Sequence, residues 1–281
     1  MVSRLRNGEI FMAVQPRSSS AVMLLRDRPS EQGIEVFMVR RVIQSDFMPD
    51  VYVFPGGSVS ADDRSVEQVE GVCTPVAPLA ADPEGLTALG TGLRATAIRE
   101  LFEEAGVLLA YTLGVMLAFN EQNMDRFDAY RQAFNQRKGS LVEMAHAEQL
   151  TLATDHLGYF AHWITPEAMP KRFDTHFFLT TAPAEQQAAH DRLETSEGTW
   201  IAPAEALERY KRGEFPLVFA TIHQLRDLAA FSSVKEALAS TTTRPVPTNM
   251  PRVVVEDGKR RVYLPGDPDS GWDVPDNIIR A

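Results

Sequence analysis

The stretch Arg99-Glu100-Leu101-Phe102-Glu103-Glu104-Ala105-Gly106-Val107 decides how the rest of the chain is interpreted. On a helix, residues three and four positions apart share a face, so the three glutamates of this stretch crowd together. Gly106 stands where a helix needs its C-terminal cap. The opposite face carries apolar residues at the spacing of a buried stripe, namely Ile98, Leu101, Phe102 and Ala105. The segment therefore predicts an amphipathic helix with a strongly acidic polar face.

The acidic face has two interpretations. Glu100, Glu103 and Glu104 repel one another, and a cation bound among them would offset that repulsion. Oxygen ligands at this density suit Mg²⁺ or Mn²⁺ rather than Zn²⁺. A helix face that is simply solvated would carry the same residues. The helix alone leaves both interpretations open, so the sequence upstream of it has to decide.

Composition and charge narrow the class of protein. The chain has 281 residues, 44% hydrophobic and 23% charged, as in ordinary soluble globular proteins. Its net charge of −10 does not attract nucleic acid or anionic membrane, so a phosphate-bearing substrate must be met by local cations or a metal ion. Cys73 is the only cysteine, and the sequence shows neither an apolar signal core nor an apolar run that could span a bilayer. We expect a cytoplasmic protein without nucleic-acid or membrane partners.

The elements of an α/β protein follow one another along the chain. Two apolar runs separated by a turn predict a β-hairpin, and a third run stops abruptly at Pro55-Gly56-Gly57. A proline near the first turn predicts a helix from Pro203, and another helix is expected from Pro216 through Phe231. The predicted strands lie at 11–15, 21–25, 34–39, 51–54, 115–119, 157–164, 173–180 and 200–201.

Two stretches interrupt this pattern. Residues 58–91 are rich in Asp, Pro and small side chains without a sustained period, and we interpret them as an inserted surface segment. Residues 120–156 carry two helical patterns and are interpreted as a second insertion. Beyond residue 240 the chain is proline-rich, forms a hairpin with Asp257-Gly258 at its turn, and ends in a loop-like tail. The predicted organisation is one domain over 1–240 and a C-terminal extension over 241–281.

Phe54-Pro55-Gly56-Gly57 and the helix at 99–107 together resemble the signature of the Nudix hydrolase family. That signature is a glycine, five residues, Glu, seven residues, and then Arg-Glu-aliphatic-x-Glu-Glu-x-Gly-aliphatic. The second half matches at every specified position. In the first half, five residues after Gly57 lead to Asp63, a shorter carboxylate than the family Glu, which usually ties the loop to the helix. The insertion at 58–91 therefore splits the box.

A split box of this kind resembles the branch of the mammalian peroxisomal coenzyme A diphosphatase. The stretches at 47–57, 163–167 and 171–178 resemble that branch as well, whereas the C-terminal Ile-Ile-Arg-Ala shows no peroxisomal signal. The family resemblance covers about residues 20–231. It implies an α/β/α sandwich of Nudix type, with a mixed β-sheet, helical insertions, and the acidic helix on one side of the sheet.

The resemblance implies metal-dependent hydrolysis of a diphosphate. Glu100, Glu103 and Glu104 would hold Mg²⁺ or Mn²⁺ with help from the backbone carbonyl of Gly56. Glu100 is alternatively the base that takes a proton from water. Arg99 would hold Glu100 in place through a charge-assisted hydrogen bond. A metal held in this way neutralises the diphosphate and lowers the pKa of bound water.

Substrate contacts are expected around the Pro-Gly-Gly turn and the 171–178 stretch. Arg40 or Arg41 could grip a phosphate or carboxylate near Gly57, although a solvated pair fits the sequence equally well. Arg172 and Asp174 could line the cleft, and a strand-end ion pair is the alternative.

Four further side chains are candidates of a different kind. The family often takes another acid from a later loop, and Glu194 and Glu197 are candidates, with an ordinary loop carboxylate as the alternative. His162 and His176 could face each other across paired strands as metal ligands. The sequence reveals no third ligand beside them, so satisfied or exposed histidines are the preferred interpretation.

The predicted function is hydrolysis of a nucleoside diphosphate linked to another moiety. Coenzyme A or an acyl-coenzyme A is the first choice, releasing a 3′,5′-ADP half and a phosphopantetheine half. The alternatives are ADP-ribose, NADH or another dinucleotide, and a Nudix-fold binding module that does not hydrolyse. The partner is a small-molecule diphosphate, and family resemblance leaves a homodimer open.

Overall fold

A mixed β-sheet forms the centre of the molecule, as predicted. The structure is a computed structural model and describes residues 4–6, 9–11, 14–45, 48–76, 91–191 and 193–274. β11 runs parallel to β3, and β13 parallel to β10, whereas the other neighbours are antiparallel. In spatial order the strands are β12 (Thr195–Ile201), β4 (Ile34–Arg41), β3 (Arg17–Asp27), β11 (Phe173–Thr181), β10 (Gly158–Ile164) and β13 (Thr248–Asn249).

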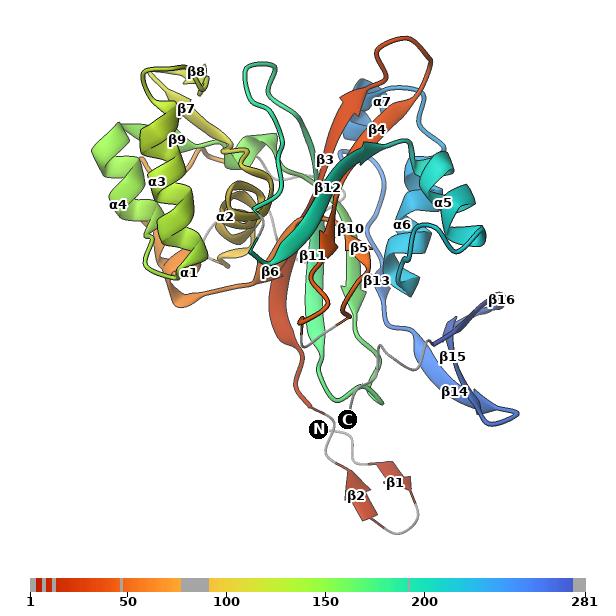
Figure 1. Cartoon of the computed structure of the whole chain (residues 1–281). Coiled ribbons are helices and arrows are strands. Elements are labelled where there is room, and N and C mark those ends of the chain that lie inside the picture. The colour runs from red at the N-terminus through yellow and green to blue at the C-terminus, as the bar shows by residue number, and fades with distance from the viewer. Residues whose placement is uncertain are drawn as a thin grey trace.

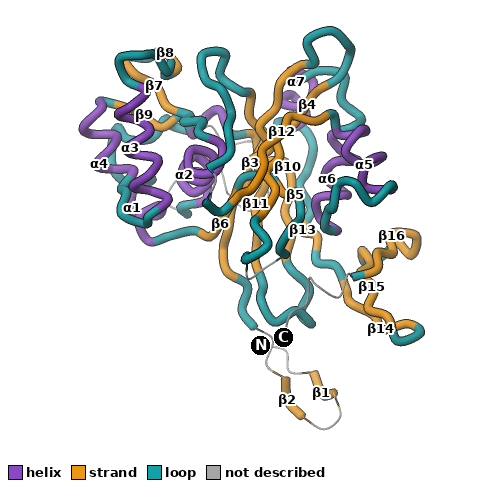
Figure 2. The backbone as a smooth tube through the Cα atoms, in the orientation of Figure 1, coloured by secondary structure: helices purple, strands orange, loops and turns teal. Residues whose placement is uncertain are grey.

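Helices cover both faces of this sheet, which confirms the α/β/α sandwich (Figure 1). The tube in Figure 2 shows the strands between the two helical layers. One layer contains α1 (Ala61–Val66), α2 (Leu93–Ala105), α3 (Met124–Asn135) and α4 (Leu141–Glu148). The other contains α5 (Pro203–Lys211), α6 (Phe219–Leu228) and α7 (Val234–Ser240).

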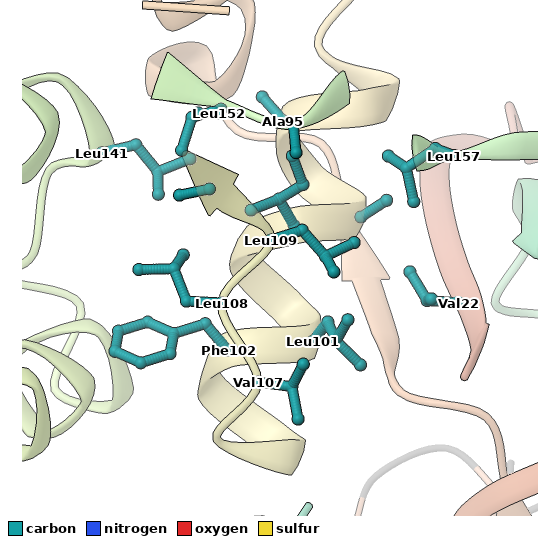
Figure 3. Packing of buried hydrophobic residues seen from close by; sticks show 14 of the residues in the cluster. Val22, Ala95, Leu101, Phe102, Val107, Leu108, Leu109, Leu141, Leu152 and Leu157 are labelled. Carbon is teal, nitrogen blue, oxygen red and sulfur yellow. The ribbon is translucent and has the colours of Figure 1, made fainter. Parts of the chain in front are cut away.

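Alternation along β3 divides the hydrophobic core into two parts. Val22 and Leu24 face α2, and Met23 and Leu25 face the α5–α7 layer. Figure 3 shows Val22 beside the apolar stripe of α2, which includes Leu101. The stripe predicted from sequence is therefore buried, and it fixes which face of α2 turns away from the sheet.

Two short strands attach the glycine turn to the sheet. β5 (Tyr52–Val53) pairs with β4, and β6 (Gly56–Ser58) pairs with β3. The helix expected from Pro216 begins only at Phe219. The reason is that the carbonyl of Pro216 accepts a hydrogen bond from the N–H of Tyr52, which keeps 216–218 extended.

The two insertions contribute to the fold in different ways. The first opens with α1, and its residues 77–90 lie outside the described residues, as does Phe47. The second supplies α3 and α4, which extend the core around α2. Phe134 of α3 contacts the ring of Phe102 at a centroid distance of 6.0 Å. A small sheet of β7 (Ala110–Thr112), β8 (Val115–Met116) and β9 (Leu150–Leu152) and the 3₁₀ turn Thr154–His156 complete this region.

The C-terminal extension joins the sheet and then forms its own ribbon. After β13, the predicted hairpin is confirmed as β14 (Arg252–Glu256) and β15 (Lys259–Leu264), with positive φ angles at both turn residues, Asp257 and Gly258. The loop-like tail was wrong over β16 (Asp267–Asp273), which pairs with β15. At the other end, β1 (Arg4–Arg6) pairs with β2 (Glu9–Phe11). Among the described residues, no helix has the length and apolar character to cross a membrane.

Candidate active site

The glycine turn and the acidic helix meet directly. Gly57 lies opposite Ser20 of β3, whose hydroxyl donates to the carbonyl of Leu93 at the start of α2 at 2.6 Å. A Cβ on Gly57 would lie 2.1 Å from Glu100 Oε1, and one on Gly56 would lie 2.5 Å from the Ser20 carbonyl oxygen. Gly56 requires glycine because the backbone of β3 leaves no room for a side chain, whereas a side chain at Gly57 would displace the Glu100 carboxylate.

Arg99 is the centre of the polar face of α2. Its Nη1 donates to Glu100 Oε1 at 2.8 Å and to Glu103 Oε1 at 3.0 Å. Its Nε and Nη2 donate to the two oxygens of Asp63 at 2.8 and 2.9 Å, and Nη2 also reaches the Ser58 carbonyl at 3.1 Å. One planar guanidinium thus fixes two glutamates of the helix relative to the turn that precedes it.

Asp63 connects α1 to α2 across the insertion. Its side chain is fully buried and accepts hydrogen bonds from the Ser60 N–H and the Thr96 hydroxyl. Burial by itself would raise the pKa of Asp63, but the hydrogen bonds and the charge of Arg99 outweigh it and hold that pKa below its usual value. The shorter carboxylate therefore ties loop to helix, the role usual for the glutamate of the family signature.

Glu67 is a residue that sequence reasoning missed. It is buried, and its carboxylate accepts from the backbone N–H groups of Gly92 and Ala95, at 2.8 Å each. The N-cap of α2 is Gly92, which has no side chain to do this, and the first turn of α2 contains no acid. Nothing in the local sequence of α2 points to Glu67, because this carboxylate lies within the inserted segment, 25 residues before Gly92.

The three glutamates lie in surroundings that disfavour their charge. Glu100 and Glu104 are buried, and Glu103 is partly exposed. Desolvation raises the pKa of Glu100 to about 7 against the opposing charge of Arg99. Desolvation also raises the pKa of Glu103, and it raises that of Glu104 further, with the neighbouring Glu100 adding to the effect. Glu104 accepts one hydrogen bond from the Gly56 N–H at 3.0 Å.

This donor set fits a divalent cation by its chemistry. Glu100, Glu103 and Glu104 offer hard carboxylate oxygens, and a cation would relieve the cost of burying their charges. Arg99 bridges Glu100 and Glu103, and the Gly56 N–H binds Glu104; within the described ranges, the group of three whose ligand atoms all lie within 4.8 Å of one another is a different one. The glutamates therefore supply the right atoms but not a closed cage.

Two of the predicted charged side chains join this face. Arg41 follows Val39 on the α2 side of β4, and its charge lowers the pKa of Glu104. Glu194 lies in the bend before β12, and its charge raises the pKa of both Glu103 and Glu104. Both side chains thus lie within electrostatic reach of the glutamates.

Two other predicted residues lie on the opposite face of the sheet. Arg40 shares the side of β4 with Met38, and its Nε donates to Asp50 at 2.8 Å. Glu197 accepts from the Tyr52 hydroxyl at 2.7 Å and lies 4.0 Å from Arg40 Nη1. These side chains form their own polar group around Tyr52, away from the acidic helix.

Arg172 and Asp174 lie at the start of β11. Arg172 is buried and donates to the backbone carbonyls of Thr165 at 3.0 Å and Val14 at 2.7 Å. Asp174 lies 2.5 Å from His162 Nε2 and 3.6 Å from His176 Nε2. The expectation that the histidines lack a third group was wrong. The signal was present in the sequence, because residues 174 and 176 of one strand share a face.

Comparisons with known proteins agree with this geometry. Residues 87–228 match the family model described as the NUDT19 Nudix domain. The chain is 25% identical over 257 residues to the acyl-coenzyme A diphosphatase NUDT19 of Xenopus laevis, covering 80% of this chain and 67% of that protein. For the protein of the same name from Gallus gallus, the identity is 28% over 267 residues, covering 78% and 70%. The crystal structure of a NUDIX hydrolase from Alicyclobacillus acidocaldarius matches in fold with a TM-score of 0.67 at 24% identity, covering 84% of this chain and 100% of that one.

Proposed function

The chain belongs to the NUDT19 Nudix domain family of pyrophosphohydrolases, and from that premise we propose that it cleaves the diphosphate of coenzyme A or an acyl-coenzyme A with the help of Mg²⁺ or Mn²⁺. One observation carries the proposal. One arginine holds Glu100 and Glu103 of a single helix, and the glycine turn holds Glu104 through the Gly56 N–H.

The proposed reaction is the attack of water on one phosphorus of the diphosphate. The new P–O bond forms as the bond to the bridging oxygen breaks, and the products are a 3′,5′-ADP half and a phosphopantetheine half. Nudix hydrolases generally use divalent metal ions, and Glu100, Glu103 and Glu104 with the Gly56 carbonyl are the groups proposed to hold one. When bound, the ion neutralises the diphosphate and acidifies water.

The protein's own residues orient the reaction and handle the proton. Arg99 keeps Glu100 and Glu103 in register with the turn, and Asp63 keeps Arg99 in place. The alternative role of Glu100 is that of the base instead of a ligand: a carboxylate that titrates near neutrality is suited to accept a proton from water, and the raised pKa of Glu100 supports this role. Arg41 supplies positive charge on the same face and is the proposed contact for a phosphate oxygen.

The choice of coenzyme A rests on relatives. The proteins from Xenopus laevis and Gallus gallus are named acyl-coenzyme A diphosphatases, and the chain spans about two thirds of each. Substrate preference within a Nudix branch depends on residues outside the box, so this part of the proposal needs a direct test. The cytoplasmic location, the homodimer and the absence of a nucleic-acid partner remain predictions from sequence.

The experiment is a product-resolved assay of the full chain with Mg²⁺ and with Mn²⁺. Coenzyme A, an acyl-coenzyme A, ADP-ribose and NADH are offered at equal concentration, and products are identified by mass. We expect 3′,5′-ADP from the coenzyme A substrates and no turnover in excess chelator. Faster cleavage of ADP-ribose or NADH would make that compound the proposed substrate instead of coenzyme A. Turnover in excess chelator would contradict the proposed metal dependence.

A further inference from the structure

A second polar cluster lies on the same face of the sheet as the acidic helix. His162 of β10 and His176 of β11 are paired in register, and both are buried. Their rings stack with centroids 4.1 Å apart and planes within 17°. Asp174 precedes His176 by two residues on the same side of β11, and its side chain is 33% exposed. The cluster is therefore buried on the histidine side and open to solvent on the carboxylate side.

The two imidazoles present the same nitrogen to this carboxylate. The Nε2 atoms of His162 and His176 lie 2.5 Å and 3.6 Å from one oxygen, Asp174 Oδ1. The other ring nitrogens are held by hydroxyl groups: His162 Nδ1 lies 2.9 Å from Thr248 Oγ1, and His176 Nδ1 lies 3.1 Å from the Tyr159 hydroxyl. Hydroxyl or carbonyl partners on the second nitrogen are what orient histidine ligands in metal sites.

We propose that His162, Asp174 and His176 form a binding site for a divalent transition-metal ion, Zn²⁺ above all, distinct from the carboxylate site on α2. Within the described ranges, this is the group of three potential ligands whose atoms all lie within 4.8 Å of one another. Two imidazoles and one carboxylate, with water completing the shell, are a common ligand set for Zn²⁺ and related ions.

Ligation requires the carboxylate to shift and at least one imidazole to turn, because the Nε2 lone pairs of two nearly parallel stacked rings do not converge on one point. Zn–N and Zn–O bonds of about 2.0–2.1 Å place tetrahedral ligand atoms about 3.3 Å apart. The distance from His176 Nε2 to Asp174 Oδ1, 3.6 Å, is already close to this value. The distance from His162 Nε2 to the same oxygen, 2.5 Å, has to open by about 1 Å. The partly exposed side chain of Asp174 can make that movement, and it leaves a path for the ion and its water.

The histidine cluster is separate from the acidic helix, but both lie along one line of paired residues that crosses the sheet from strand to strand. Gly57, Ser20, His176 and His162 follow one another on β6, β3, β11 and β10. Strands lie about 4.8 Å apart, so His176 is about 10 Å from the glycine turn. Since Thr248 belongs to β13, an ion at this site would also brace the C-terminal extension against the sheet.

The test measures Co²⁺, a spectroscopic substitute for Zn²⁺, on tag-free protein in excess Mg²⁺. Mg²⁺ occupies oxygen-only sites but competes poorly for imidazole nitrogen. We expect one equivalent of Co²⁺ to bind with the visible absorption of a low-coordinate site and to be displaced by Zn²⁺. Asp174→Asn, which keeps shape and hydrogen bonding, and His176→Phe, which keeps ring stacking, should each weaken Co²⁺ binding at least tenfold.

Two matched variants make the result decisive. His146→Asn removes an exposed histidine of α4, and Glu103→Gln alters the acidic helix, so both should bind Co²⁺ like the wild type. If His176→Phe fails to fold by circular dichroism, Asp174→Asn alone decides. The proposal is wrong if the wild type takes up no Co²⁺ in excess Mg²⁺, or if Asp174→Asn binds it as tightly. The cluster would then be a hydrogen-bonded brace.

Discussion

The acidic helix and the histidine cluster lie on one face of the same sheet, yet the charges of their buried polar groups are balanced in opposite ways. Beside α2, the carboxylates of Asp63, Glu100 and Glu103 surround one permanently charged arginine. At the start of β11, one carboxylate faces two imidazoles that carry charge only when protonated. The first group holds an excess of negative charge that calls for a hard cation, whereas the second offers nitrogen ligands near electrical balance. The type of ligand atom therefore supports the proposal that diphosphate cleavage takes place at the helix.

The strongest test of this division is Glu103→Gln on the acidic helix. The change preserves shape but removes one of the carboxylate charges that Arg99 positions. We expect the rate of diphosphate cleavage to fall on the order of 10²–10³-fold, as for loss of one electrostatic stabiliser of a transition state. Steady-state kinetics with coenzyme A as substrate and circular dichroism of the variant measure the two quantities needed.

The matched changes are Glu143→Gln, on an exposed position of α4, and Asp174→Asn in the histidine cluster. The first should leave the rate unchanged, and the second should reduce it far less than Glu103→Gln does. An equal loss for Asp174→Asn would show that both clusters serve the reaction, and the contrast between them would have to be abandoned.

Arg99→Met tests how much the permanently charged arginine of the acidic helix contributes to the free energy of unfolding. The arginine is largely buried, and its removal leaves the fully buried Asp63 without its counter-charge. Breaking a buried ion pair in this way costs about 3–5 kcal/mol of unfolding free energy. Urea denaturation measures the loss, and Arg126→Met, which removes an exposed ion pair with Glu148, should cost much less. Equal losses for the two variants would mean that Arg99 contributes no more than a surface charge.

The pH dependence of stability tests the excess negative charge directly. The folded-state pKa of Glu100, about 7, lies above its value in an unfolded chain. A raised pKa of this kind contributes stability that is complete below about pH 4 and is lost as the pH rises through 7. In excess chelator, we expect the stability of the wild type relative to Glu100→Gln to fall by on the order of 3 kcal/mol between pH 4.5 and 8.

The comparison with Glu100→Gln is necessary because His223 shifts in the opposite sense. Burial lowers the pKa of His223, so this residue adds stability as the pH rises. Its contribution is the same in both proteins and cancels in the difference. Chemical denaturation at each pH gives the two curves, and a difference that stays flat or increases with pH would contradict the proposed repulsion among the glutamates.

Much of the fold followed from local sequence patterns because helical spacing and apolar runs are local features. The stripe on α2 and the strands at β3, β4 and β11 were predicted, and they decide the two layers of the core. The start of α6 was predicted too early because the Pro216 carbonyl pairs with Tyr52, a contact made far along the chain. Two-residue strands such as β13 have no periodicity of their own and depend on their neighbours.

The site divides along the same line. The charged residues of α2, namely Arg99, Glu100, Glu103 and Glu104, share a face because helical spacing dictates it. Glu67 could not be predicted, since it reaches the start of α2 from within the insertion at 58–91. Asp174 could have been grouped with His176 from its spacing alone. The sequence suggested His162 and His176 as partners on adjacent strands. Asp174, two residues before His176, is the third member of the group.

The smallest predicted effect separates Glu194 from Glu197, which the sequence offered as equivalents. Their separation follows from their positions: Glu194 lies in the bend before β12, whereas Glu197 of β12 pairs with Arg40 and shares its face of the sheet. Of these two candidates, Glu194 is the one whose charge raises the pKa of Glu103 and Glu104.

We expect Glu194→Gln to raise the Mn²⁺ concentration for half-maximal activity roughly threefold to fivefold, which corresponds to a binding free energy under about 1 kcal/mol for an exposed charge. Glu197→Gln should leave that concentration unchanged, because its partners Tyr52 and Arg40 lie across the sheet. If Glu197→Gln raised that Mn²⁺ concentration more than Glu194→Gln did, the choice of Glu194 as the further acid of the site would be wrong.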